Sequence, residues 1–218
     1  MDLIQQEIET GVMEEIAAIE KPMLNLGCGK ILLPCDRPDH HHLVDADIYD
    51  HPTWLNVDVS PNVGADEVVD VFRYPWPWPD DSFSGALLSH LAEHIPHHIF
   101  TTPWIPHDIE HAEYIQALPD GFYAFFAELR RVLEPDAIVH ILSPYGLSLA
   151  DPTHTRPIVP ATFGYLSPDE DAPFAKDYGS HFEVDNNPVI QYQNTGLIGT
   201  SQIATPVEFS IQLRAVKT

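Results

Sequence analysis

The sequence has few basic residues. Its 218 residues include 10 Lys and Arg against 33 Asp and Glu, which gives a formal net charge of -23 at pH 7. Non-specific affinity for DNA and RNA comes largely from Lys and Arg that displace counterions, so this balance argues against bulk nucleic acid as a partner. We expect a small-molecule ligand instead. The acidic excess favours solubility and would suit a host with high internal salt.

Cysteines and long apolar runs are also scarce. Cys28 and Cys35 lie in one short stretch and do not form the spaced framework of a small secreted domain. No apolar run reaches the roughly 20 residues that cross a bilayer. The acidic N-terminus lacks the basic and then apolar order of a secretion signal. We therefore expect a cytoplasmic protein with no membrane segment.

The length of the chain predicts one main domain preceded by a helix. Apolar residues between Leu3 and Ile19 recur at three- and four-residue spacings, which predicts an amphipathic N-terminal helix over residues 1–21. This helix would pack on the sheet edge or on a partner, so a homo-oligomer or an assembly partner remains open. Residues 22–218 form the predicted main domain.

Short apolar segments alternate with helical or polar segments in this domain. We expect one long helix at Gly121–Leu133. We expect strands at Met23–Leu26, Trp54–Asp58, Glu67–Val71, Ser84–Ser89, Ala137–Ser143, Val189–Tyr192 and Val207–Val216. The alternating prolines of Tyr74–Asp81 exclude a helix and predict an extended connector. The order of elements predicts an α/β fold with a mostly parallel sheet flanked by helices and an antiparallel last strand.

Glycines and acids occur at the ends of three predicted strands. Gly27 and Gly29 follow the first strand, where a sharp turn lets a ligand approach the backbone without a Cβ in the way. The second strand ends in Asp58, whose carboxylate can accept the ribose hydroxyls of an adenosyl group, and the third ends near Asp70. Because parallel strands end at one edge of a sheet, these residues predict one nucleotide-type site.

Several segments of the sequence follow one another in an order that can be compared with that of known motifs. They are Leu24–Gly29, Asp70–Phe83, Leu88–Ile95, Phe126–Pro135 and Asp151–Pro157. In this order they resemble the motifs of class I S-adenosylmethionine-dependent methyltransferases. The resemblance implies a Rossmann-like fold, S-adenosylmethionine as cofactor, and transfer of a methyl group to an acceptor that the sequence does not identify.

The resemblance also implies which residues hold the cofactor. This set comprises Asn25, Gly27, Cys28, Gly29, Asp58, Val59, Asp70, Val71, Ser89 and His90. The glycines would line the methionine and ribose portions, and Asp58 would hold the ribose. Asp70 and Val71 would lie beside the adenine. Ser89 and His90 would lie near the sulfonium.

The sequence departs from the family pattern at three places. Lys30 and Ile31 stand where a further glycine is common, and the following stretch, with His40–His42, is too rich in Pro and His for the usual long first helix. Both departures predict weaker cofactor binding. Asp136 replaces a glycine of a surface turn, with little expected effect on catalysis.

Methyl transfer needs little from side chains, because the sulfonium is already a strong electrophile and the protein has only to align the acceptor. An alcohol or amine acceptor would also need a general base. His90, His94 and His154 are candidates because imidazole titrates near neutrality. No metal site is assigned.

The acceptor site is expected in two insertions, Pro96–Pro119 and Asp151–Asn187, which are long for structureless connections. A set of aromatic side chains would line either an acceptor pocket or a protein interface. The set comprises Trp76, Trp78, Phe100 and Trp104.

Two alternatives compete with an active methyltransferase. His90–His94 matches the His-x-x-Glu-His pattern of inverted zinc peptidases, in which two histidines on one helix face hold the metal. That motif should lie within a helix, whereas here it follows a predicted strand. The other alternative is a non-catalytic module that keeps the fold and serves in an assembly.

Overall fold

The computed structural model describes residues 21–34, 46–97, 120–146, 151–167, 181–198 and 201–217. Several features of the sequence lie outside these ranges, namely the predicted helix at Leu3–Ile19, His40–His42, Phe100, Trp104 and most of the Pro96–Pro119 insertion. Within the described ranges, no helix is long and apolar enough to cross a membrane.

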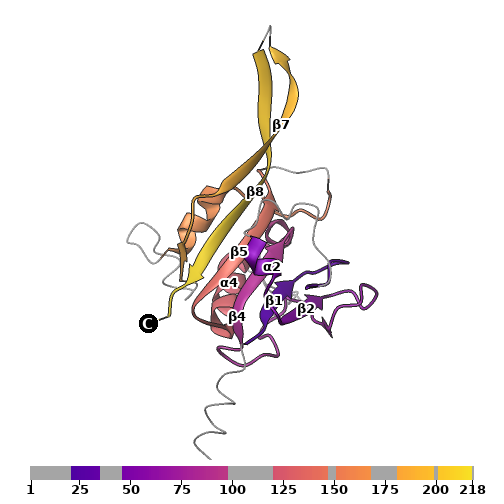
Figure 1. Ribbon diagram of the computed structural model, residues 1–218, viewed down its shortest axis with the longest axis vertical. Helices are drawn as coiled ribbons and strands as arrows, with labels where there is room; N and C mark the ends of the chain where they lie inside the picture. Colours follow the sequence, from indigo (N-terminus) through magenta and orange to yellow (C-terminus); the bar gives the residue numbers. More distant parts are fainter. Residues whose placement is uncertain are drawn as a thin grey trace, which may run out of the picture.

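Strands alternate with helices and turns along much of the chain (Figure 1). The strands are β1 (Met23–Leu26), β2 (Trp54–Asp58), β3 (Glu67–Val68), β4 (Phe83–Ser89), β5 (Leu133–Pro144), β6 (Phe182–Val184), β7 (Val189–Ile198) and β8 (Ser201–Ala215). The helices, including two 3-10 turns, are α2 (Ala46–Tyr49), η2 (Ala92–His94), α4 (Gly121–Val132) and η3 (Pro160–Leu166).

The strands form one sheet in the order β3-β2-β1-β4-β5-β8-β6, and β7 pairs with β8. β1 to β5 are parallel, whereas β8 is antiparallel to β5. This arrangement confirms the predicted α/β fold with an antiparallel last strand. β1 lies between β2 and β4, so the strand order reverses direction there. Such a switch point is where open α/β sheets bind ligands at their carboxyl edge.

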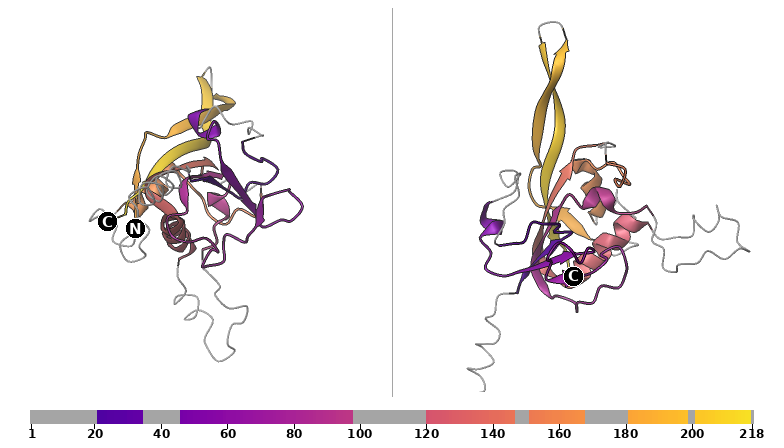
Figure 2. Two further views of the ribbon diagram at one scale, coloured as in Figure 1. Left: turned by 60° about the horizontal axis from the view of Figure 1, so that its bottom comes forward. Right: turned by 90° about the vertical axis from the view of Figure 1, so that its right-hand side faces the viewer.

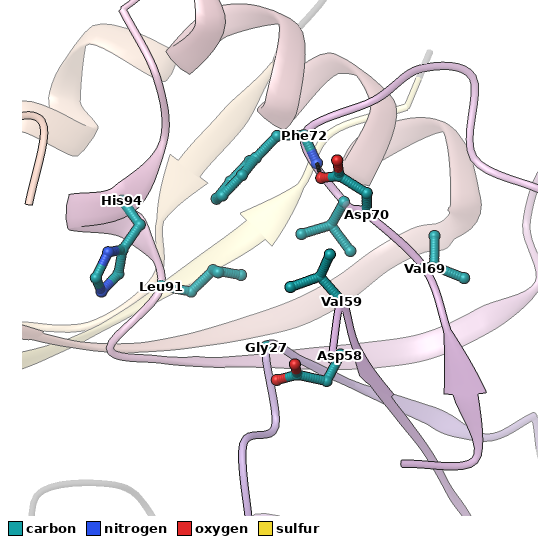
Figure 3. Close-up of a pocket in the computed structure, with 9 residues that line it drawn as sticks. Gly27, Asp58, Val59, Val69, Asp70, Phe72, Leu91 and His94 are labelled. Carbon is teal, nitrogen blue, oxygen red and sulfur yellow. Dashed lines mark hydrogen bonds between the residues drawn. The ribbon is translucent and has the colours of Figure 1, made fainter. Parts of the chain in front are cut away.

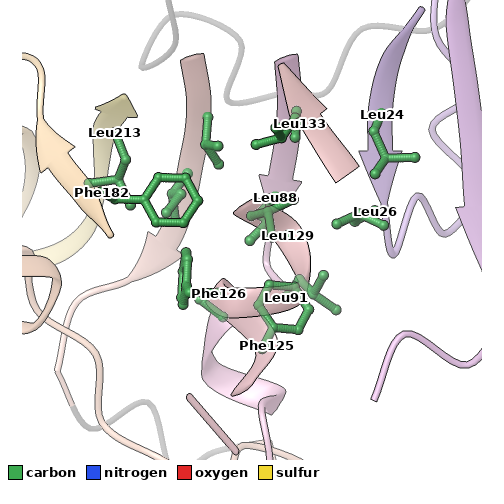
Figure 4. Close-up of a cluster of buried hydrophobic side chains, with 14 of the residues drawn as sticks. Leu24, Leu26, Leu88, Leu91, Phe125, Phe126, Leu129, Leu133, Phe182 and Leu213 are labelled. Carbon is green, nitrogen blue, oxygen red and sulfur yellow. The ribbon is translucent and has the colours of Figure 1, made fainter. Parts of the chain in front are cut away.

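Two apolar clusters fix the layers on either face of the sheet. Alternate residues of β1 point to opposite faces, so Leu24 and Leu26 join the large cluster while Met23 joins a smaller one. Helix α4 covers the large cluster and α2 the smaller one, on opposite sides of the sheet (Figure 2). The apolar residues of α4 and Leu133 after it are buried, namely Phe122, Phe125, Phe126, Leu129, Val132 and Leu133. Figure 4 shows Phe125, Phe126, Leu129 and Leu133 of this set.

The third strand is shorter than predicted. β3 pairs with β2 only through Val57 with Glu67 and Asp58 with Val68, because β2 ends at Asp58. The prediction that this strand continues to Val71 is wrong. Residues 69–71 leave the sheet at its carboxyl edge, so their side chains become available to line a site.

The proline-rich connector contains no helix, as predicted, but it runs through bends and turns rather than fully extended, and its tryptophans are not at the surface. Trp76 and Trp78 are only 3% and 8% exposed and belong to the large cluster. Their indole N–H groups donate to the carbonyl oxygen of Val71 and to Oε2 of Glu67, both at 3.0 Å. The prediction that these two residues line an acceptor pocket or an interface is therefore wrong.

The last strand is longer than predicted and lies inside the sheet. β8 pairs with β5 over Glu208–Arg214 and with β6 over Leu213–Ala215, and its residues from Ser201 to Ser210 pair with β7. In Figure 1, β7 and β8 extend together as a two-stranded arm away from the sheet. Phe209, Ile211 and Leu213 are buried, but Val207 is only half-buried and the polar neighbours Glu208 and Ser210 are buried as well, so burial does not simply alternate along this strand.

Candidate cofactor site

The turn after β1 carries both motif glycines in the left-handed region. Gly27 has φ of 64° and Gly29 has φ of 53°, a conformation that favours glycine. Leu26 pairs with Val57, which brings the turn beside the end of β2. The backbone N–H of Gly29 donates to Oδ2 of Asp58 at 2.9 Å. The glycine turn and the carboxylate therefore lie side by side at one edge of the sheet, as predicted.

The carboxylate of Asp58 is held in place by backbone donors. Its other oxygen, Oδ1, accepts from the N–H of Ser60 at 2.8 Å. Each carboxylate oxygen has a second lone pair, so both can still accept a hydrogen bond from a ligand. The two backbone bonds fix the side chain before any ligand arrives, which lowers the cost of binding.

Asp70 organises the loop that follows β3. Its Oδ1 accepts from the N–H of Phe72 at 3.1 Å, and its Oδ2 lies 3.0 Å from Nε of Arg73. The N–H of Arg73 also donates to the carbonyl oxygen of Asp70 at 3.0 Å. This turn directs the segment from Val69 to Phe72 along one side of the glycine turn.

These elements enclose a cavity of about 260 Å³. Its lining combines two acids, one glycine and mostly apolar side chains, namely Gly27, Asp58, Val59, Val69, Asp70, Val71, Phe72, Leu91 and His94. In Figure 3, His94 and Leu91 lie on one side, and Asp58, Val59 and Asp70 lie on the other. The volume is near the lower end of ligand pockets, and an apolar wall with a few fixed polar groups is typical of them.

At Gly27 the positive φ, more than the available space, favours glycine, because the atom nearest to an added Cβ is the end of the flexible Leu91 side chain. A Cβ at this position would lie 2.9 Å from Cδ1 of Leu91, whereas a Cβ at Gly29 would meet nothing within 4 Å. The backbone of Gly29 is therefore open to an approaching group. A glycine turn of this kind lets a ligand approach the backbone closely.

Half of the predicted cofactor residues line the cavity: Gly27, Asp58, Val59, Asp70 and Val71. Gly29 adjoins it through its bond to Asp58. Asn25 does not line it, because its amide donates to the carbonyl oxygen of Ile31 and to Oδ1 of Asn56, both at 3.0 Å. Cys28 is buried, and burial, with the nearby carboxylate of Asp58, raises the pKa of its thiol to about 11.

Ser89 and His90 lie at the end of β4, outside the set that lines the cavity. Nε2 of His90 is 2.8 Å from Oε1 of Glu208, and its Nδ1 is 3.5 Å from Oε1 of Glu93. The contacts with the carboxylates of Glu208 and then of Glu93 raise the pKa of His90 to about 9. At neutral pH this imidazole is charged, so it is poorly suited to act as a general base that removes a proton from the methyl acceptor.

The other two base candidates lie together. The rings of His94 and His154 are 4.8 Å apart and nearly perpendicular. Nε2 of His154 is 3.9 Å from Oε1 of Glu93. Only His94 of the pair lines the cavity.

The sequence did not indicate Leu91, Val69 or Phe72 as parts of the site. Val69 and Phe72 flank the predicted pair Asp70 and Val71. A prediction that ended β3 earlier and assigned a longer loop after it would have included both residues in the site. Leu91 follows His90 directly, but its contact with the glycine turn depends on the pairing of β1 with β4. No local pattern in the sequence carries that information.

The zinc peptidase arrangement is not formed. His90 ends β4 with φ of 54°, and Glu93 and His94 belong to the three-residue turn η2. The two histidines therefore do not lie four apart on one α-helix, as that motif requires.

Known proteins show the same architecture. No family model and no curated protein matches the sequence. The YcgJ protein of Bacillus subtilis has a TM-score of 0.50 and 13% identity, over 95% of this chain and 98% of its own. A candidate methyltransferase of Bacillus halodurans has a TM-score of 0.51 and 10% identity, over 95% and 98%. The chain has the class I methyltransferase fold. Within this methyltransferase fold the cavity lies at the carboxyl ends of β1 and β2, the edge at which such sheets bind ligands.

Proposed function

We propose that this protein is an S-adenosylmethionine-dependent methyltransferase that acts on a small-molecule acceptor. The observation that carries the proposal is the hydrogen bond from Gly29 to Asp58 at the edge of an apolar cavity. A positive-φ glycine turn, a fixed carboxylate and apolar walls are the three features that an adenosyl group needs. The candidate methyltransferase of Bacillus halodurans shares the fold.

The residues present fit the cofactor. Asp58 would accept the ribose hydroxyls, because both of its oxygens keep a lone pair. The adenine would lie among Val59, Val71 and Phe72, whose apolar side chains suit a flat ring. The open backbone at Gly29 leaves room for the rest of the molecule. When bound, S-adenosylmethionine supplies an electrophilic methyl group.

Calorimetric titration with S-adenosylmethionine and S-adenosylhomocysteine tests the proposal. We expect both to bind, and we expect Asp58→Ala to weaken binding. A hydrogen bond to a charged group contributes about 1.5–3 kcal/mol, which is roughly 10- to 100-fold in affinity. Asp80→Ala is the matched control, because Asp80 pairs with Arg131 and does not line the cavity.

Two outcomes would contradict the proposal in different ways. If neither compound binds the wild-type protein at millimolar concentration, the non-catalytic module is the better account. If Asp58→Ala binds as tightly as the wild type, the adenosyl group does not lie against this carboxylate.

A further inference from the structure

Glu93, His94 and His154 form a cluster beside the proposed cofactor cavity, which His94 also lines. Each offers one ligand atom, and these atoms all lie within 4.8 Å of one another. We propose that this cluster binds a divalent first-row transition metal, with Zn²⁺ as the preferred ion. Two imidazoles and one carboxylate are a common donor set for zinc.

Glu93 supplies an independent observation that points to a cation. The side chain is 3% exposed. Its Oε2 accepts from the hydroxyl of Ser143 at 3.1 Å, but its Oε1 has no hydrogen-bond partner among the described residues. A buried carboxylate oxygen without a donor is costly. The groups nearest to Oε1 are Nδ1 of His90 at 3.5 Å and Nε2 of His154 at 3.9 Å.

The surroundings of His94 orient its ring as in a metal ligand. Nδ1 of His94 lies 3.2 Å from both the carbonyl oxygen and the hydroxyl of Thr153. The hydroxyl donates to Oδ1 of Asp151 at 2.6 Å, so toward His94 it is an acceptor. Both contacts therefore require a proton on Nδ1, which leaves the lone pair on Nε2. Metal-binding histidines usually donate their second N–H to such a carbonyl or carboxylate network.

Hydrogen bonds to the backbone carbonyl oxygens of η2 and the residues after it hold the two parts of the cluster together. The N–H of Thr155 donates to the carbonyl oxygen of Glu93 at 2.9 Å, and its hydroxyl donates to that of Ile95 at 2.7 Å. Arg156 bonds to the carbonyl oxygens of Ile95 and Pro96 at 3.1 and 3.0 Å. These bonds position His154 against η2 without the help of an ion.

Small side-chain rotations complete the proposed site. Ligand atoms of a tetrahedral zinc, at about 2.1 Å from the ion, lie about 3.4 Å apart, so the distances within the cluster have to shorten by up to about 1.4 Å. Three protein ligands leave a fourth position open, as in zinc sites that take an exogenous ligand. His90 remains with Glu208 and is not one of the three ligands.

Zinc titration by calorimetry tests the inference, in a background where His40, His41 and His42 are replaced by glutamine because a run of histidines can itself bind metal. We expect one equivalent per chain at micromolar affinity or tighter. Glu93→Gln and His154→Gln should weaken binding more than about 100-fold, and Ser143→Ala roughly tenfold, as for groups that orient a ligand. His51→Gln is the matched control and should bind as the background does, since His51 is not a member of the cluster and its Nδ1 lies 2.9 Å from the carbonyl oxygen of Thr53.

Cobalt spectroscopy keeps the test decisive if a variant folds poorly. With Co²⁺, His154→Cys should gain a thiolate-to-cobalt charge-transfer band in the near ultraviolet, which His51→Cys should lack. The inference is overturned if zinc does not bind stoichiometrically, if Glu93→Gln binds it unchanged, or if His154→Cys shows no such band. The metal titration needs no S-adenosylmethionine, so its result is independent of the proposed methyltransferase activity.

Discussion

At the scale of single residues, the glycine turn contains one side chain whose chemical reactivity can be measured directly. Cys28 lies between Gly27 and Gly29 and is buried. Its backbone N–H donates to the carbonyl oxygen of Val57 at 3.0 Å, which keeps the turn against β2. The reactivity of the thiol therefore reports whether the turn is formed.

We predict that Cys28 reacts slowly with iodoacetamide in the folded protein. Burial and then Asp58 raise its thiol pKa to about 11, so the group stays protonated until the pH approaches that value. At pH 8 only about one thiol in a thousand is the reactive thiolate, against about a quarter for an ordinary cysteine. Alkylation measured by peptide mass spectrometry should be roughly 100-fold slower than in the urea-unfolded chain. Equal rates in the two states at pH 8 would contradict this placement of Cys28.

Residue patterns in the sequence located part of the site. Gly27, Asp58 and Asp70 were predictable because each follows an apolar segment that ends at a turn. Leu91 and the pairing of Glu93 with His154 were not, because both depend on contacts between segments far apart in the chain. The cluster of Glu93, His94 and His154 also shows why the sequence suggested the wrong metal motif. The motif contains two of the three clustered residues, but the third comes from a later segment.

At the scale of elements, the start of α4 is fixed by two neighbouring residues. Asp120 caps the helix, with its Oδ1 accepting from the N–H of Phe122 at 2.8 Å. Gly121 lies against the segment that follows η2, and its N–H donates to the carbonyl oxygen of His97 at 2.9 Å. The helix that covers the large apolar cluster is thereby attached to the segment that carries Glu93 and His94.

We predict that Gly121→Ala destabilises the protein. An added Cβ would lie 1.9 Å from the carbonyl oxygen of Pro96, so the backbone has to move. Overpacking of this kind costs about 1–3 kcal/mol in the free energy of unfolding. Gly164→Ala in η3 is the control, since a Cβ there meets nothing within 4 Å. Urea denaturation measures both, and equal stability of the two variants would show that this contact is not made.

Most elements were predictable, and those that were not depend on their partners. β1, β2, β4 and α4 have local apolar patterns and lie within a few residues of their predicted ranges. The end of β3 depends on the length of β2, and the burial of Trp76 and Trp78 depends on α4 and β4. Before Glu208, β8 pairs with β7 alone among the described strands, and Thr205, Pro206 and Val207 are not buried.

At the scale of the whole molecule, the formal charge of -23 dominates the electrostatics. Ion pairs such as Lys21 with Glu134 and Lys217 with Asp81 involve few of the acids, because basic residues are scarce. Most carboxylates therefore repel one another in the compact state.

We predict that potassium chloride stabilises the fold. The Debye length falls from about 10 Å at 0.1 M to about 3 Å at 1 M, which screens the repulsion between surface carboxylates. The free energy of unfolding from urea titrations should rise between these two concentrations. Potassium chloride is preferred to sulfate, because sulfate also strengthens apolar burial. A lower stability at 1 M would mean that the few ion pairs outweigh the net charge.

The central claim is that one cavity, between the glycine turn and the loop after β3, receives an adenosyl group. A crystal structure of the protein with S-adenosylhomocysteine tests it most directly. We expect the ribose hydroxyls within hydrogen-bond distance of Asp58 and the adenine against Val71 and Phe72. Adenosine bound elsewhere, or an empty cavity in crystals grown at saturating ligand, would contradict the account.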